Sequence, residues 1–163
     1  MDDTRITRLK VLVATSTLAL AIVCSLAIAQ PSVYAQQQSS ESFTAKLTGK
    51  DEVPPVNTQA TGSAQFQLSS DGKELNYDLT ATNLQGFMMA HIHQGKAGEN
   101  GQPVAPLQMG KGKITSSDLQ GPLAGKQISD LMNIIKNVEG YVNVHTNQNQ
   151  NGEIRGQIMK SSG

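Results

Sequence analysis

Cysteine is nearly absent from this sequence, and tryptophan is absent altogether. The one cysteine, Cys24, lies in an apolar stretch near the N-terminus, so a domain that follows this stretch has no thiol and can form no disulfide. Thiolate catalysis and cysteine-based zinc sites are therefore excluded for that domain. Its stability must come from burial and backbone pairing, which is feasible for a domain of roughly 130 residues.

Aromatic side chains and net charge are scarce as well. Aromatic residues make up 4% of the chain, and 13 basic residues balance 13 acidic ones. Nucleic-acid binding requires a clustered basic surface, often with aromatic side chains that stack on bases. The composition therefore argues against a nucleic-acid partner.

The N-terminus has the three parts of a secretory signal peptide. Arg5, Arg8 and Lys10 form a positive flank. An uncharged, apolar run follows at residues 11–28, and Ala35 offers a cleavage point after it. The run is also close to the length that spans a bilayer, so an uncleaved anchor is the alternative. In both cases the positive flank stays inside and the rest of the chain lies outside.

We expect three segments: a signal peptide or N-terminal membrane anchor at residues 1–35, a flexible linker at 36–42 and a folded domain at 43–159. The linker is indicated by its polar QQQSS run, which has nothing to bury. Lipidation of Cys24 is a third way to anchor the chain, although Val23 stands where that motif requires a small residue. The protein is therefore expected to be secreted or held at the cell surface.

Alternating apolar and polar residues predict β-strands in the folded domain. Residues 60–68 and 75–81 alternate in this way, and Asp71-Gly72 between them is typical of a hairpin turn. Five more strands are predicted, at residues 43–47, 87–93, 111–115, 141–146 and 154–159.

One segment follows a helical period instead. Leu131, Ile134 and Ile135 share one face of a short helix predicted near residues 129–137, with Ser129 as its N-terminal cap. The predicted fold is therefore all-β. We expect an antiparallel β-sandwich or barrel, immunoglobulin-like or superoxide-dismutase-like, with one short α-helix.

The three histidines of the chain are the candidate metal ligands. His91 and His93 are two apart on a predicted strand, so they share a face, and the apolar Ala90 and Ile92 point to the other. His145 lies on the polar phase of another predicted strand. Three imidazoles can bind copper or zinc if these two strands are neighbours. The alternative is that exposed histidines brace loops through hydrogen bonds to backbone carbonyls.

Other polar and soft side chains are predicted near these histidines. Strand pairing across the turn at residues 147–152 places His145 opposite Glu153 or Arg155 on the outward face. Met88 and Met89 offer thioethers, which are soft ligands that suit copper. Met88 falls on the apolar phase of its strand, so we expect it to pack in the core.

Several blocks of the sequence together resemble the CHRD (chordin-type) domain family. The blocks are Leu47-Thr48-Gly49, Glu52 to Val56, Leu84, His91 to Gly95, Gly98, Gly121-Pro122-Leu123, Tyr141 to Thr146 and Gly152 to Ile158. The resemblance runs from about Phe43 to Met159 and keeps the order of the blocks. It implies an extracellular, β-sandwich-like domain whose molecular function is largely undefined.

A weaker, local similarity connects the histidines to Cu/Zn superoxide dismutase. Residues 90–93 and 144–145 are similar to the copper-ligand strands of that family, and Glu153 to Gly156 resembles its C-terminal arginine segment. The zinc-loop histidines and aspartate, and the disulfide cysteines, have no counterparts in this sequence. The similarity therefore implies only a reduced, three-histidine copper or zinc site.

The sequence leaves two functions open. The first is a non-catalytic binding or structural module of the cell exterior or envelope, with an unidentified protein or cell-surface ligand as its partner. The second is a copper- or zinc-binding protein that uses His91, His93 and His145, with or without redox activity. No catalytic residue is predicted, and only superoxide-dismutase-like activity of the second kind would make the protein an enzyme.

Overall fold

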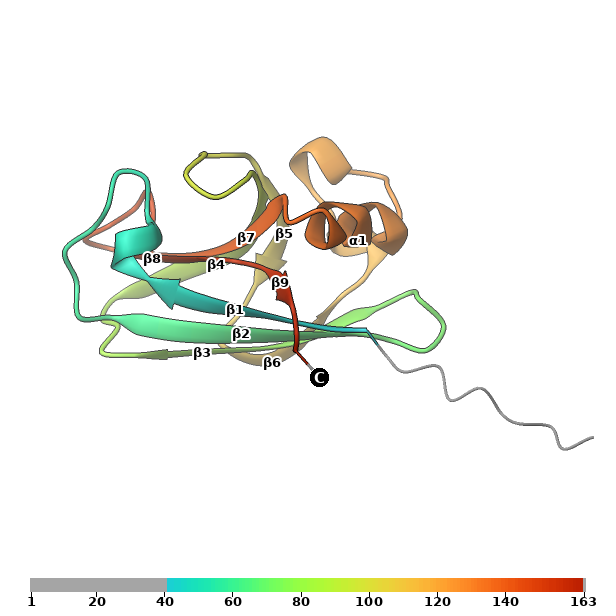
Figure 1. Ribbon diagram of the computed structural model, residues 1–163, viewed down its shortest axis with the longest axis horizontal. Helices are drawn as coiled ribbons and strands as arrows, with labels where there is room; N and C mark the ends of the chain where they lie inside the picture. The colour runs from blue at the N-terminus through green and yellow to red at the C-terminus, as the bar shows by residue number, and fades with distance from the viewer. Residues whose placement is uncertain (1–40, 163) are drawn as a thin grey trace, which may run out of the picture. The chain divides into compact units, whose positions relative to one another are not determined.

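The computed structural model of the protein describes residues 41–162 (Figure 1). The predicted signal peptide or anchor, and most of the predicted linker, lie outside the described residues. Within the described part, no helix combines the length and the apolarity that crossing a bilayer requires. Regular secondary structure begins at Ser42 and ends at Lys160.

The described residues form one nine-stranded antiparallel sheet. Its strands are β1 (Ser42–Thr48), β2 (Thr61–Leu68), β3 (Leu75–Thr82), β4 (Phe87–Gln94), β5 (Pro103–Leu107), β6 (Gly110–Ile114), β7 (Gly140–Thr146), β8 (Ile154–Gln157) and β9 (Met159–Lys160). The order is β5-β4-β7-β8-β1-β2-β3-β6, and β9 also pairs with β1. The two end strands, β5 and β6, follow each other directly in the chain, so the sheet curls into a nearly closed, two-layered barrel (Figure 1). The predicted all-β fold is confirmed.

The hydrophobic core lies between the two layers of the barrel. Phe66 on β2 is flanked in register by Phe43 on β1 and Tyr77 on β3, and all three rings are buried. Gln65 and Gln67, on the opposite phase of β2, are exposed. Burial of each such apolar side chain contributes roughly 1.5–3 kcal/mol, so this alternation holds the strand in its register.

The turn between β2 and β3 is built on Asp71 and Gly72. Gly72 has a φ of +70°, a left-handed conformation that glycine adopts at little cost. The Asp71 carboxylate accepts hydrogen bonds from the Ser69 hydroxyl at 2.7 Å and from the Lys73 backbone N–H at 3.1 Å. The predicted hairpin is confirmed.

One α-helix and three short 3₁₀ helices complete the described chain. They are α1 (Ile128–Lys136), η1 (Gly49–Asp51), η2 (Ser116–Asp118) and η3 (Gly121–Leu123). The predicted helix is therefore present, but Ser129 is not its cap. Gln127 is the N-cap residue, and its backbone N–H donates to the carboxylate of Asp130 at 2.9 Å. Asp130, the third residue of the helix, thus caps the helix from inside its first turn. The helix therefore begins at Ile128, one residue earlier than predicted.

Strand β5 was not predicted, because Pro103 and Pro106 interrupt its pattern. Proline has no backbone N–H to donate, so it is tolerated mainly on edge strands. β5 is such a strand, at one end of the order, and it places Pro106 opposite His91. The predicted strand at residues 154–159 is divided between β8 and β9.

Candidate metal centre

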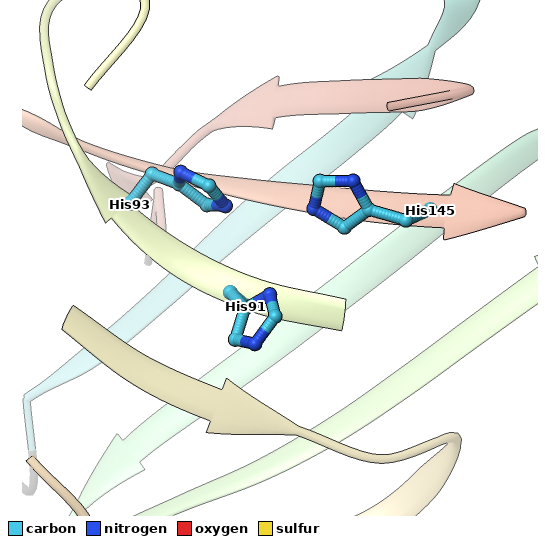
Figure 2. Close-up of side chains that lie close together, drawn as sticks. All are labelled: His91, His93 and His145. Carbon is cyan, nitrogen blue, oxygen red and sulfur yellow. The ribbon is translucent and has the colours of Figure 1, made fainter. Parts of the chain in front are cut away.

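Two neighbouring strands carry the three histidines. β4 and β7 pair antiparallel, with Met89 opposite His145, His91 opposite Asn143 and His93 opposite Tyr141. Directly opposed residues project to the same side of a sheet, so the three histidines emerge together. Their ring centroids are 5.7 Å apart in each of the three pairs. Figure 2 shows the rings gathered around one point above the two strands.

The spacing of the ring nitrogens fits a small metal ion. One nitrogen from each of His91, His93 and His145 lies within 4.8 Å of the other two. A tetrahedral ion bound at ~2.0–2.1 Å would hold its ligand nitrogens about 3.4 Å apart. Each nitrogen would therefore have to move by about 0.8 Å or less, which a small side-chain rotation supplies.

Backbone carbonyls set the tautomers of two of the rings. Nδ1 of His93 lies 2.9 Å from the carbonyl oxygen of Gly101, and Nδ1 of His145 lies 2.9 Å from that of Gln150. A carbonyl can only accept, so each Nδ1 carries the proton, and in the neutral ring Nε2 keeps its lone pair. Nε2 of both rings, and Nδ1 of His91, are buried and have no hydrogen-bond partner among the described residues.

The surroundings keep all three imidazoles neutral. Burial lowers the pKa of His93 to about 4, and the Gly101 carbonyl opposes this only in part. Burial also lowers the pKa of His145, and burial together with the nearby His145 lowers that of His91. Metal ions bind the neutral form of histidine. At neutral pH the three rings are therefore in the state that a metal ion requires.

The histidines are less exposed than the sequence pattern predicts. They do lie on the polar side of the sheet, as predicted, but the loops of residues 95–102 and 147–153 reach His93 and His145 there through the carbonyls of Gly101 and Gln150. His93 and His145 are each only 8% exposed. The first loop runs so close to β4 that a Cβ on Gly101 would lie 1.5 Å from the carbonyl oxygen of Gln94. Only glycine fits there, and this close approach brings the Gly101 carbonyl to His93.

Arg155 on β8 fastens the 95–102 loop. Its guanidinium donates to the carbonyl oxygens of Lys96 at 2.9 Å and Glu99 at 2.7 Å. It also lies 3.4 Å above the centre of the Tyr141 ring, and that ring stacks on His93 with centroids 5.1 Å apart. Arg155, Tyr141 and the loop therefore position His93 from two sides.

The prediction that Arg155 would point into solvent is wrong. Arg155 pairs with Asn143 rather than with His145, and its side chain is only 2% exposed. Besides the two carbonyls, its guanidinium donates to Oδ1 of Asn100 at 3.2 Å. A guanidinium used in this way has a structural role and offers little to an incoming anion.

Glu52 and Asn143 lie buried beside Arg155, although no sequence motif marks either of them as a site residue. Burial raises the pKa of Glu52 to about 7, and the positive charge of Arg155 offsets this in part. A Cβ on Gly152 would lie 2.5 Å from Oδ1 of Asn143 and 2.6 Å from Oε1 of Glu52, so three distant segments meet here. No periodic pattern marks Glu52, since it lies in an irregular connection.

Met88 does not pack in the core as predicted. The β4–β7 register shifts between Phe87 and Met89, so that Met88 is an extra residue on β4. Such a bulge turns side chains away from the regular alternation. Met88 and Met89 are each 43% exposed.

Comparison with known proteins identifies the domain. A family model described as the CHRD domain matches residues 43–158, which include the whole of β2 to β8 and all three histidines. No curated protein and no solved structure matches the chain. The family match covers most of the sequence and agrees with the resemblance found in the blocks above. The chain belongs to the CHRD domain family, a family of extracellular-type domains.

Proposed function

We propose that this chain is a non-catalytic, extracellular metal-binding protein in which His91, His93 and His145 hold one copper or zinc ion. The proposal rests on two observations: one ring nitrogen from each of the three histidines lies within 4.8 Å of the other two, and each ring has a buried nitrogen with no hydrogen-bond partner among the described residues. A buried polar atom without a partner costs ~1–3 kcal/mol. A shared ion would satisfy all three nitrogens at once.

The loop-bracing alternative explains only part of this arrangement. Nδ1 of His93 and Nδ1 of His145 do brace loops through the carbonyls of Gly101 and Gln150. Bracing gives no role to either Nε2, and it gives none to His91. In metal sites, the second nitrogen of a ligating histidine usually donates to a carbonyl or carboxylate, which orients the ring. The carbonyl contacts therefore support the metal proposal.

The donor set favours copper or zinc among the common ions. Neutral imidazoles suit both metals, whereas magnesium and calcium prefer oxygen ligands. Three protein nitrogens leave a tetrahedral ion one open position. When bound, the ion would supply a Lewis-acidic centre, and the chain's own residues would orient it and limit its contact with water.

A binding role is favoured over superoxide-dismutase-like catalysis. The chain has three histidines in total, so it has none left for a second metal site of the dismutase kind. The guanidinium of Arg155 is engaged with the 95–102 loop. Export through the N-terminal segment, and recognition of a protein or cell-surface ligand, stay predictions from the sequence.

A thermal melt of the full-length protein tests the proposal. Zinc or copper at about 100 times its Kd should stabilise the folded state by ~2.7 kcal/mol, which raises the melting temperature by about 10 °C. Magnesium should have no such effect. His93→Ala should abolish the rise, whereas Lys126→Ala, a change at an exposed residue far from the rings in sequence, should keep it. A wild-type protein that neither metal stabilises, or a His93→Ala protein that still responds, would contradict the proposal.

A further inference from the structure

A methionine lies beside the three histidines on the same side of the sheet. Met89 is directly opposite His145 in the β4–β7 register. It also precedes His91 by two residues on β4, and residues two apart on a strand share a face. Cβ atoms of directly opposed residues are ~4.5–5.5 Å apart, so the Met89 side chain starts within reach of two of the three rings.

The surroundings of Met89 leave its thioether free to move. The bulge at Met88 interrupts the regular pairing of β4, and Met89 is 43% exposed although its side chain is large and apolar. His93 and His145 are each only 8% exposed, whereas His91, the histidine closest to Met89 on β4, is partly exposed. The most exposed of the three histidines is therefore the one two residues from Met89. A methionine side chain has three rotatable bonds and adapts readily to a neighbouring atom.

The chemistry of a thioether selects among the metals that three imidazoles accept. Thioether sulfur is a soft ligand that favours monovalent copper, whereas zinc sites are built from cysteine, histidine and carboxylate ligands. Three histidines leave one position of a tetrahedral ion open. We propose that the ion held at this site is monovalent copper and that the sulfur of Met89 is its fourth ligand. This inference rests on the proposed function, since it adds a ligand to the three-histidine site.

Measuring copper(I) and zinc affinities side by side tests the Met89 ligand separately from the three-histidine site. Monovalent copper is titrated into the full-length protein under anaerobic, reducing conditions against a chromophoric copper(I) chelator, and zinc is titrated in parallel. Met89→Leu should weaken copper(I) binding by at least the ~10-fold that loss of a supporting residue costs a metal site. Its zinc affinity should stay within about twofold of the wild type, because leucine preserves the bulk of the side chain and the histidines are intact.

The matched controls are two other exposed methionines. Met159→Leu alters a residue that is 49% exposed on β9, opposite Thr44 of β1 rather than the histidines, and should change neither affinity. Met88→Leu tests the neighbouring methionine and should also leave copper(I) binding unchanged. X-ray absorption of the copper(I)-loaded wild type should show one sulfur ligand that Met89→Leu lacks.

The outcomes are distinct for the two claims. If the wild type binds neither metal, the three-histidine proposal fails and this inference fails with it. If the wild type binds both metals and Met89→Leu binds copper(I) as tightly as the wild type, only the fourth ligand is overturned. A loss of copper(I) affinity in Met88→Leu, with Met89→Leu unaffected, would also overturn the assignment to Met89.

Discussion

Replacing Arg155 with alanine is expected to lower the free energy of unfolding by about 3–5 kcal/mol. The guanidinium is almost fully buried, and it donates to the carbonyls of Lys96 and Glu99 and to the side chain of Asn100. Hydrogen bonds to charged groups contribute ~1.5–3 kcal/mol each, and the two carbonyls would be left without this donor. The contact with the Tyr141 ring would be lost as well.

The same substitution should weaken metal binding. The Arg155 side chain holds the 95–102 loop, and that loop supplies the Gly101 carbonyl that orients His93. Loss of such supporting contacts typically costs a metal site ~10–100-fold in affinity. We therefore expect the zinc Kd of Arg155→Ala to rise by about that factor in protein that is still folded.

Urea unfolding with a chelator present, followed by zinc titration, measures both effects. Arg155→Lys should recover little of the stability, because an ammonium group lacks the planar fork that reaches several acceptors and stacks on Tyr141. Lys126→Ala, at an exposed position, should stay within ~0.5 kcal/mol of the wild type. A loss below about 1 kcal/mol for Arg155→Ala would show that the arginine does not fasten the loop.

The second large effect is a loss of stability in acid that depends on His93. Its pKa is about 4 in the folded protein, against an ordinary value of 6.5. Between these values the unfolded chain binds a proton that the folded protein does not, so stability falls as the pH falls from 6.5 to about 4. The change in pKa corresponds to about 3 kcal/mol.

Comparison with His93→Gln isolates this contribution. Glutamine does not titrate, and its amide can donate to the Gly101 carbonyl in place of Nδ1. Glu52 acts in the opposite sense: with its pKa raised to about 7, it contributes stability at low pH that is lost as the pH rises through that value. Glu52 is present in both the wild type and His93→Gln, so its contribution cancels when their free energies of unfolding are subtracted.

Urea unfolding at a series of pH values, with a chelator to remove metal, gives the difference directly. The wild type should lose about 3 kcal/mol relative to His93→Gln between pH 6.5 and pH 4, and no further difference should develop above pH ~7. A difference that does not change with pH would mean that His93 is protonated as easily in the folded protein as in the unfolded chain.

The strands could be predicted from the sequence wherever one face of the sheet is apolar. Phe66 and Gln65 on β2 show why: burial of one and exposure of the other leave a two-residue period in the sequence. β5 leaves no such signal, because Pro103 and Pro106 stand in it. An edge strand needs fewer backbone donors, so the fold tolerates a sequence that argues against a strand.

The clustering of the three histidines could be predicted in the same way, but the residues that support them could not. His91 and His93 share a face by strand geometry alone. His145 can join them only if its strand is a neighbour of theirs, and this condition could be written down from the sequence. Arg155 contacts an irregular loop and Glu52 lies in an irregular connection. Contacts with irregular segments leave no periodic pattern in the sequence. A buried arginine bound to carbonyls and an exposed one look the same in a sequence.

The location of a bound ion tests the central claim most directly. Crystals of the full-length protein grown with zinc or copper, and measured at the absorption edge of the metal, would show the ion by its anomalous scattering. We predict one ion at ~2.0–2.1 Å from Nε2 of His93, Nε2 of His145 and a ring nitrogen of His91. Crystals that contain the metal elsewhere, with the three rings unliganded, would contradict the account.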